Sequence, residues 1–227
     1  MSSPVEPSDP KSSVEHSTWV EDWSANLDTD QYINSLCDGG VNTINIFVGQ
    51  LDIVDGKPTI DGYSMDTPGL PGGTGMFPSK KALTDFITRC KEKGINVKLS
   101  IGGADGNPFG ESWKKLTDSN IDDFAKALVD ICKQTGAEGI DFDDELEDTT
   151  IAARAGKLAA AFKAQDPDLQ ASFCVFGGIS DSGPMHAVDK VFLENAKLKD
   201  GQSVIDRVYV MTYYDGCTVS ENEQFMK

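Results

Sequence analysis

The sequence is poor in the groups that would bind nucleic acid or an anionic membrane. Of its 227 residues, only 20 are Lys or Arg against 37 Asp or Glu, which gives a formal net charge of -17. Nucleic acids and anionic lipid surfaces both attract Lys and Arg, so we expect neither as a partner. The acids are spread along the chain and indicate a solvated surface. The oligomeric state stays open.

The sequence also has few side chains that would hold a metal ion. It contains only two histidines, His16 and His186, and neither has a second plausible metal ligand beside it. The five cysteines are far apart, odd in number and without a C-x-x-C pair. This pattern predicts neither a disulfide framework nor a zinc site, and we expect no metal and no cofactor.

Long apolar runs are absent, and the N-terminus has no targeting pattern. No stretch reaches the roughly 18 apolar residues that a membrane helix needs. The segment "MSSPVEPSDPKSSVEHS" has neither an apolar core nor a basic start, so it is not a signal peptide. We expect the chain as numbered to be cytoplasmic, or secreted if a targeting segment has been removed. Residues 1–16 are rich in Ser, Pro and acids and predict a disordered segment before one domain over 17–227.

Within that domain, apolar β-branched runs alternate with segments of helical periodicity. The helix over 119–136, for example, repeats apolar residues at spacings of three and four. Six strands are predicted, over 17–23, 41–51, 95–103, 138–145, 169–178 and 204–215. Five helices are predicted between them, over 29–40, 79–94, 119–136, 149–167 and 185–201. The Gly- and Pro-rich residues 52–78 are expected to form a long loop.

Strict alternation of strands and helices predicts a parallel sheet with right-handed crossovers. A doubly wound open sheet and a (β/α)8 barrel both satisfy it, and two details favour the barrel. No Gly-rich phosphate loop follows the first strand. Polar or site-forming residues gather at the C-terminal ends of the strands, where barrel active sites lie. They are Ser100, Asp143, Glu145, Met211 and Tyr213.

The stretch "EGIDFDDE" over 138–145 places acids at every second position of a predicted strand. Alternate side chains of a strand share a face, so Asp141, Asp143 and Glu145 line one face at intervals of about 6.6 Å. Ile140 and Phe142 lie on the other face, suited to packing against helices. The acids therefore point into the barrel, where they cannot all ionise, and at least one must hold a proton. A carboxylic acid that stays protonated near neutral pH can serve as a general acid.

These acids have two other interpretations. The first is a charged loop or an acidic sheet edge, but neither would require the preceding apolar residues or the regular alternation. A divalent metal site is the second, because Asp-rich strand ends bind magnesium.

Together with two further motifs, this stretch resembles glycoside hydrolase family 18, the chitinases and endo-β-N-acetylglucosaminidases. "EGIDFDDE" resembles the family signature D-G-x-D-x-D-x-E on barrel strand four. "KLSIGG" over 98–103 matches S-x-G-G on strand three, and "VMTYYD" over 210–215 resembles M-x-Y-D on strand six. The resemblance covers about residues 17–215 and implies a TIM-type (β/α)8 barrel.

The resemblance implies a retaining, substrate-assisted glycosidase. Glu145 would protonate the glycosidic oxygen, and the 2-acetamido oxygen of the sugar would attack C1. Asp143 would bond the acetamide N–H, Asp141 would share a proton with Asp143, and Tyr213 would donate to the acetamide oxygen. Further residues expected to support or line the substrate site are Ser100, Gly102, Gly103, Met211, Tyr214 and Asp215.

The implied substrate carries N-acetylglucosamine in β-1,4 linkage, either in chitin oligomers or in the chitobiose core of N-glycans. Two rival functions remain. The first is a chitin- or glycan-binding lectin on the same fold, although the intact acids count against it. The second is a metal-dependent barrel enzyme that uses the same acids as ligands.

The sequence departs from the family pattern at several positions. Glu138 replaces the first Asp of the signature. Asp144 fills a position that is usually apolar, and we expect it to point outward where water reaches it. The sixth strand has one residue too many before its Asp, so Tyr214 takes the place of that Asp and Asp215 is displaced. For Trp19 on strand one, two roles remain as alternatives: its ring stacks on a sugar, or it packs the chain against the barrel.

The sequence ends about twelve residues after the sixth predicted strand. Strands seven and eight of a barrel are thus absent from it, and so is the tryptophan that floors the sugar pocket in the family. We expect the chain to be a fragment of a longer protein.

Overall fold

The structure is a computed structural model that describes residues 15–21, 29–60, 80–104, 108–145, 147–176 and 187–211. Strands and helices alternate along it as the sequence predicts. Six parallel strands form one sheet in the order β1-β2-β5-β6-β7-β8. Their bounds are Ser17–Glu21, Thr43–Gly49, Asn96–Ala104, Gly139–Glu145, Gln170–Phe176 and Arg207–Met211.

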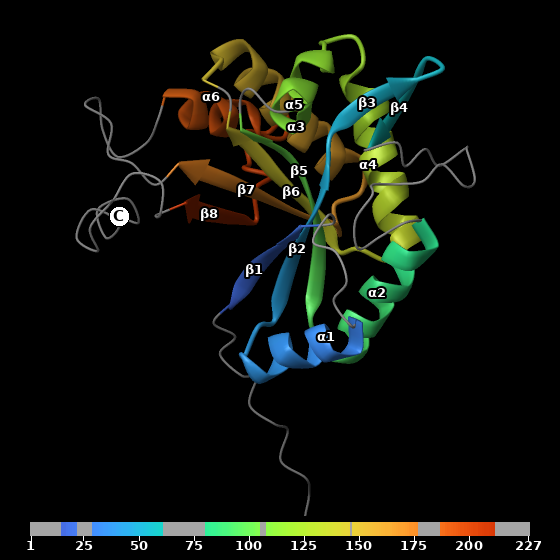
Figure 1. The fold of residues 1–227 in the computed structure, drawn as a ribbon. Helices are drawn as coiled ribbons and strands as arrows, with labels where there is room; N and C mark the ends of the chain where they lie inside the picture. The colour runs from blue at the N-terminus through green and yellow to red at the C-terminus, as the bar shows by residue number, and fades with distance from the viewer. Residues whose placement is uncertain are drawn as a thin grey trace, which may run out of the picture.

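The sheet curls into part of a barrel, and helices cover its outer face (Figure 1). The connecting helices are α1 (Thr29–Asp38), α2 (Lys80–Glu92), α4 (Ile121–Thr135), α5 (Thr149–Gln165) and α6 (Ala187–Asn195). The prediction of a (β/α)8-type barrel represented by six strands is thereby confirmed. Strands β1 and β8 are the two edges of this sheet.

The core lies between the outer face of the sheet and the helices. Ile140 and Phe142 of β6 are fully buried there, as alternation predicts. Phe142 lies 6.3 Å, centroid to centroid, from Phe162 of α5, and Phe173 of β7 stacks on Phe192 of α6 at 3.7 Å. Burial of aromatic side chains of this size holds each helix against the strand beside it. The inner face is left for polar residues.

One element contradicts the sequence-based expectation. Part of the long loop expected over 52–78 is an antiparallel hairpin, formed by β3 (Leu51–Val54) and β4 (Lys57–Ile60). Its turn is Asp55-Gly56, with φ of 51° and 76°. An Asp-Gly pair between apolar runs favours such a two-residue turn, because both positions require positive φ. The rest of that range, 61–78, lies outside the described residues.

A second unexpected element follows β5. The short helix α3 (Pro108–Glu111) continues into the 3-10 turn η1 (Ser112–Lys115), and both lie near the C-terminal ends of the strands (Figure 1). Trp113 of η1 is fully buried.

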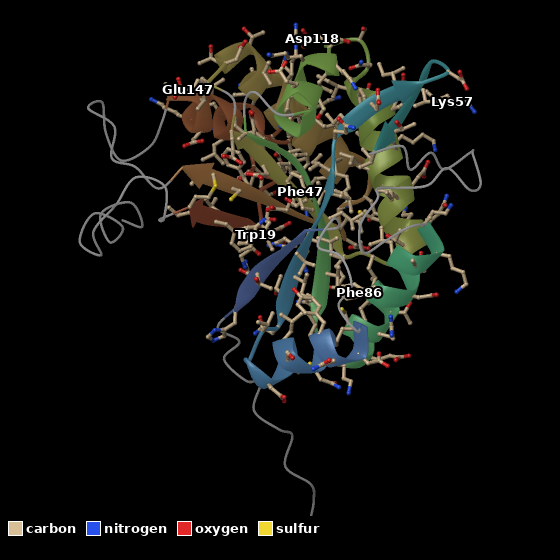
Figure 2. All side chains as sticks on the ribbon, in the orientation of Figure 1. Trp19, Phe47, Lys57, Phe86, Asp118 and Glu147 are labelled. Atoms are coloured by element: carbon tan, nitrogen blue, oxygen red, sulfur yellow. The ribbon has the colours of Figure 1, made fainter. Side chains whose placement is uncertain are left out.

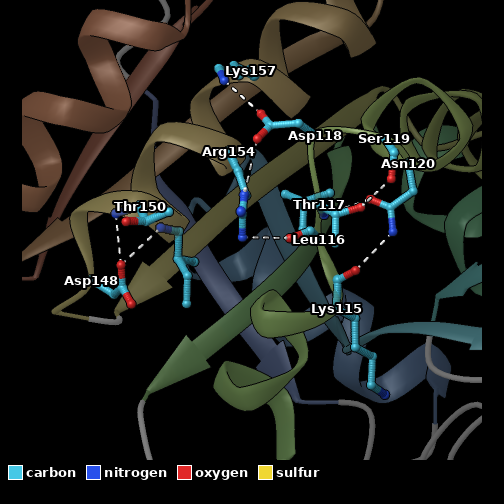
Figure 3. A network of polar contacts seen from close by, with 11 residues as sticks. Lys115, Leu116, Thr117, Asp118, Ser119, Asn120, Asp148, Thr150, Arg154 and Lys157 are labelled. Carbon is cyan, nitrogen blue, oxygen red and sulfur yellow. Dashed lines mark hydrogen bonds and ion pairs between the residues drawn. The ribbon is translucent and has the colours of Figure 1, made fainter.

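The turn after η1 is bonded to α5, the helix that follows the acidic strand (Figure 3). Arg154 of α5 donates to the carbonyl of Leu116 at 3.3 Å, and Lys157 bonds Asp118 at 2.8 Å. At the start of α5, Asp148 accepts hydrogen bonds from the backbone N–H groups of residues 150 and 151, at 2.8 and 3.2 Å. This N-cap, three residues after Glu145, fixes where α5 begins.

No helix among the described residues is long and apolar enough to cross a bilayer.

Candidate active site

The acidic residues of β6 come together with polar residues of the neighbouring strands because the sheet register aligns them. Asp141 pairs with Ser100 of β5 on one side and with Ser172 of β7 on the other. One step toward the C-terminal end of the strands, Asp143 pairs with Gly102 and Cys174. Ala104 stands opposite Glu145. The three acids therefore rise in order along one inner face of the sheet.

Asp141 is fully buried and surrounded by hydrogen-bond donors. Ser172 Oγ donates to its Oδ1 at 2.5 Å, and Ser100 Oγ donates to its Oδ2 at 2.9 Å. Trp19 Nε1 also donates to Oδ2, at 3.1 Å. An indole N–H can only donate, so that oxygen must accept. Donors from three different strands therefore meet at this one carboxyl group.

Trp19 thus has a polar role in addition to its ring contacts. It lies on edge strand β1 and is 37% exposed (Figure 2). Its ring meets that of Tyr209 on β8 edge to face, with centroids 5.0 Å apart. The contact joins the two edge strands across the interior. Among the described residues the geometry places Trp19 against Asp141 and Tyr209.

Asp143 is 7% exposed and lies in a different environment. Its Oδ1 is buried and has no hydrogen-bond partner among the described residues. Burial raises the pKa of Asp143 well above its ordinary value, and the neighbouring carboxyls of Glu145, Asp141 and Asp144 raise it further. The carboxyl therefore holds a proton under conditions in which an exposed Asp has lost it.

Glu145 is the last residue of β6 and is only partly buried. Burial raises the pKa of Glu145 above the ordinary value of a glutamic acid. Asp143 is thus the deeper acid and is held neutral, whereas Glu145 is the shallower acid at the strand end. Of the three acids on this face of β6, Glu145 lies closest to the C-terminal face of the barrel.

Gly102 allows β5 and η1 to approach Asp143 closely. A Cβ at Gly102 would lie 2.2 Å from the carbonyl oxygen of Asp143 and 2.3 Å from Nε1 of Trp113. The φ of Gly102 is +107°, a value that side-chain-bearing residues rarely adopt. The Trp113 indole N–H donates to the same carbonyl at 3.4 Å. Glycine at position 102 therefore makes room for the tryptophan behind the acid.

Four residues that contact this site were not identified from the sequence. They are Trp113, Lys98, Ser172 and Tyr209. For Lys98 a signal was present, because it stands two positions before Ser100 and so shares its face of β5. The same period-two rule places Tyr209 on the face of Met211. Ser172 and Trp113 reach the site through strand register and tertiary packing, which no local pattern reveals.

The remaining predicted site residues divide into two groups. Met211, at the end of β8, is 5% exposed and pairs with Phe176 in the sheet. Gly103 pairs with Asp144 and has φ of 113°. Tyr213, Tyr214 and Asp215 lie outside the described residues.

One expectation about the acidic stretch is wrong. Asp144 was expected where water reaches it, but its side chain is only 3% exposed. The expectation considered the strand alone, whereas α3, which no pattern predicted, packs over β5 beside this position. Its partner Gly103 has a backbone oxygen only 2.6 Å from where a Cβ at Gly110 of α3 would lie.

The described residues contain no group of three or more His, Cys, Asp or Glu side chains arranged to hold a metal ion. A cavity of about 420 Å³ lies at the opposite end of the sheet from Glu145, at the starts of the strands. Its lining includes Thr43, Asn96, Gln170 and Arg207. Active sites of (β/α)8 barrels lie at the C-terminal ends of the strands, so this cavity is not part of the acidic site.

These observations define a parallel-barrel scaffold with a graded trio of acids along its fourth strand. The fold is that of the glycoside hydrolase family 18 chitinases of known structure. A chitinase from Rhizomucor miehei is 18% identical over 92% of this chain, with a TM-score of 0.59. A family 18 chitinase from Chromobacterium violaceum is 15% identical over 88% of it, and one from Cycas revoluta, a mutant in complex with (GlcNAc)4, is 16% identical over 87%, both with a TM-score of 0.59.

The chain spans 63%, 51% and 54% of the lengths of these three proteins. At such identities the likeness establishes the fold alone. No protein-family profile and no curated protein sequence matches the chain.

Proposed function

We propose that this chain carries the acidic residues of a retaining glycosidase that hydrolyses β-1,4-linked N-acetylglucosamine. In the proposed reaction Glu145 gives its proton to the glycosidic oxygen as the bond to C1 breaks. The 2-acetamido oxygen of the same sugar attacks C1 and forms an oxazolinium-type intermediate. Water then attacks C1 while Glu145 takes back a proton, so that the anomeric configuration is retained.

The observation that carries the proposal is the environment of Asp143. It is a buried, protonated acid whose Oδ1 has no partner among the described residues, and it lies beside an acid that is nearer the surface. Such an oxygen can accept a hydrogen bond from the acetamide N–H and stabilise the positive charge that develops on that group. In the proposed mechanism Asp141, which accepts from three donors, shares the proton of Asp143.

The structural neighbours supply a substrate class for this chemistry. The Cycas revoluta chitinase was solved with (GlcNAc)4, and a class V chitinase from Nicotiana tobaccum with NAG4. We extend this class of sugar to the present chain as part of the proposal. The remaining assignments, Tyr213 as donor to the acetamide oxygen and Met211, Tyr214 and Asp215 as lining of the pocket, stay predictions.

The test is cleavage of a chitin oligosaccharide by the 227-residue chain and by Glu145→Gln, with products followed by mass spectrometry. We expect the variant to lose roughly a hundredfold or more of the cleavage rate, as removal of a general acid does. Glu147→Gln is the matched control, because Glu147 is an exposed acid two residues away. Equal cleavage by the parent and Glu145→Gln would refute the role of Glu145. Absence of cleavage by the parent would refute the activity of this chain.

A further inference from the structure

Lys98 is a charged side chain inside the barrel that the proposed reaction does not use. It lies on β5, is 1% exposed, and is the only buried Lys or Arg among the described residues. Placing an ammonium group in a protein interior costs several kcal/mol unless partners compensate it. Its partners therefore indicate why it is there.

The ammonium nitrogen contacts two hydroxyl groups on different strands. It lies 3.0 Å from Ser172 Oγ on β7 and 2.6 Å from the hydroxyl of Tyr209 on β8. It also lies over the ring of Tyr209, 4.5 Å from the centroid. An aromatic face attracts a cation there.

The two carboxyl groups that accept from these hydroxyls determine the direction of each hydrogen bond around Lys98. The Ser172 hydroxyl donates to Asp141, and the Tyr209 hydroxyl donates to Glu15. Each hydroxyl has a single proton, so its oxygen must accept from Lys98. The ammonium group therefore donates both ways and connects two carboxyl groups through one hydroxyl each.

The titratable and charged groups near Lys98 come from several elements of the sheet. They are Glu15 before β1, Asp141, Asp143 and Glu145 on β6, Cys174 on β7, and Asp206, Arg207 and Tyr209 at or on β8. Carboxyls outnumber cations among them, and of the cations only Lys98 is buried. Burial lowers the pKa of Lys98, while Asp141 and Glu15 oppose that change. Burial also raises the pKa values of Cys174 and Tyr209, which stay neutral.

We propose that Lys98 is a positioning residue: through the Ser172 hydroxyl, its ammonium group holds Asp141 in place and keeps the proton of the acidic trio on Asp143. The catalytic consequence rests on the proposed function, whereas the electrostatic coupling of Lys98 to Asp141 does not. A proton held on Asp143 lies next to Glu145 and next to the sugar of the proposed reaction. A proton on Asp141 would leave two ionised carboxyls side by side at the upper end of β6.

The coupling can be measured without any activity, from the side-chain NMR signals of lysine labelled at Cε and Nζ. The Lys98 signal is assigned with Lys98→Met and followed against pH in the parent and in Asp141→Asn. Since coupling between two charges is reciprocal, we expect removal of the Asp141 charge to make Lys98 lose its proton at a pH lower by at least about one unit. A Lys98 that titrates identically in both proteins overturns the proposal.

The catalytic consequence is measured on the pH profile of chitin oligosaccharide cleavage. In Lys98→Met we expect kcat to fall at least tenfold with KM within about twofold of the parent, and the acidic limb to move to higher pH. Ser172→Ala, which keeps the amine and removes the bridging hydroxyl, should move the limb in the same direction by less. Lys126→Met, on the exposed side of α4, is the control for loss of a lysine.

The outcomes separate the two proposals. A lowered kcat with an unmoved pH profile would give Lys98 a merely structural role and overturn the positioning role. If Lys98→Met does not fold, Asp141→Asn and Ser172→Ala decide the matter by NMR and kinetics. If the parent cleaves no chitin oligosaccharide, the proposed function fails, and the lysine titration still decides whether Lys98 is the counter-ion of Asp141.

Discussion

At the scale of single residues, three acids of similar chemistry on one strand have three different environments. Asp141 is enclosed by donors from β1, β5 and β7. Asp143 is also buried but has an oxygen without a partner among the described residues. Glu145 is nearer the surface. Depth along the strand therefore separates an acid enclosed by donors, an acid held neutral and an accessible acid, which is how one site can hold both a proton donor and a stabilising group.

The neutral state of Asp143 predicts a pH dependence of stability. A carboxyl whose pKa is raised on folding binds more protons when folded, so its presence costs stability as the pH rises above 3.8, the ordinary value of an Asp. Asp143→Asn removes this cost. From pH 4 to pH 7 the free energy of unfolding of the variant should therefore increase relative to that of the parent. The increase should be about 1.4 kcal/mol for each unit by which folding raises the pKa of Asp143 within that pH range. Urea unfolding at both pH values measures it.

Asp118→Asn is the control with the opposite sign. The hydrogen bond from Lys157 holds the pKa of Asp118 below its ordinary value. Its charge stabilises the fold above the unfolded pKa, and this contribution is lost only as the pH falls. The variant should therefore gain nothing between pH 4 and pH 7. A constant difference between Asp143→Asn and the parent across that range would contradict a neutral Asp143.

At the scale of elements, the local patterns predicted most of the fold. The helix over 121–135 follows from its apolar spacing, and its end follows from Gly136, which adopts φ of 80°. The inner face of β6 follows from strict alternation of acids with Ile140 and Phe142. These elements were predictable because one side of each is uniformly apolar, and that periodicity is a local property.

The rest of the site was not predictable because it depends on distant partners. Trp19, Ser100 and Ser172 meet at Asp141 although Trp19 is 122 residues away in sequence. Lys98 was overlooked because a lysine in a strand is normally solvated. The hairpin at Asp55-Gly56 did carry a local signal, but the surrounding Gly and Pro residues favoured a loop.

The start of α5 gives a prediction about one element. Asp148 is the N-cap and accepts from two backbone N–H groups that the helix itself leaves unpaired. We expect Asp148→Ala to lower the free energy of unfolding by about 1 kcal/mol, whereas Asp148→Ser should retain most of it. Denaturant titration followed by circular dichroism measures both. Equal losses in the two variants would show that the cap acceptor is not what stabilises this end of α5.

At the scale of the whole molecule, side chains connect the two edges of the sheet across the interior. Glu15, just before β1, accepts from Arg207 Nε at 3.1 Å and from the Tyr209 hydroxyl, both on β8. Trp19 and Tyr209 add a ring contact at 5.0 Å. Backbone pairing does not join β1 to β8 among the described residues. These polar contacts thus hold the curl of the sheet.

Loss of the Glu15 contacts should therefore weaken the whole fold. We expect Glu15→Ala to lower the free energy of unfolding by about 1–3 kcal/mol, because a half-buried Tyr209 hydroxyl loses its acceptor. Arg207→Gln should cost only about 0–1 kcal/mol, since its side chain is 61% exposed and its pair is screened by water. Chemical unfolding followed by tryptophan fluorescence compares them. A larger loss in Arg207→Gln than in Glu15→Ala would contradict this ranking.

The contact between Glu15 and Tyr209 also bears on how the chain is made. The two residues are 194 positions apart. At roughly 5–20 residues per second, a ribosome needs about 10–40 s to synthesise that interval. During this time β1 can pair with β2, but the inner side of Trp19 has no Tyr209 to cover it. Strand β1 leaves the ribosome before the other strands of this sheet and is consequently among the last of them to be fully packed, so its inner side is the part of the sheet that stays open to misassociation longest.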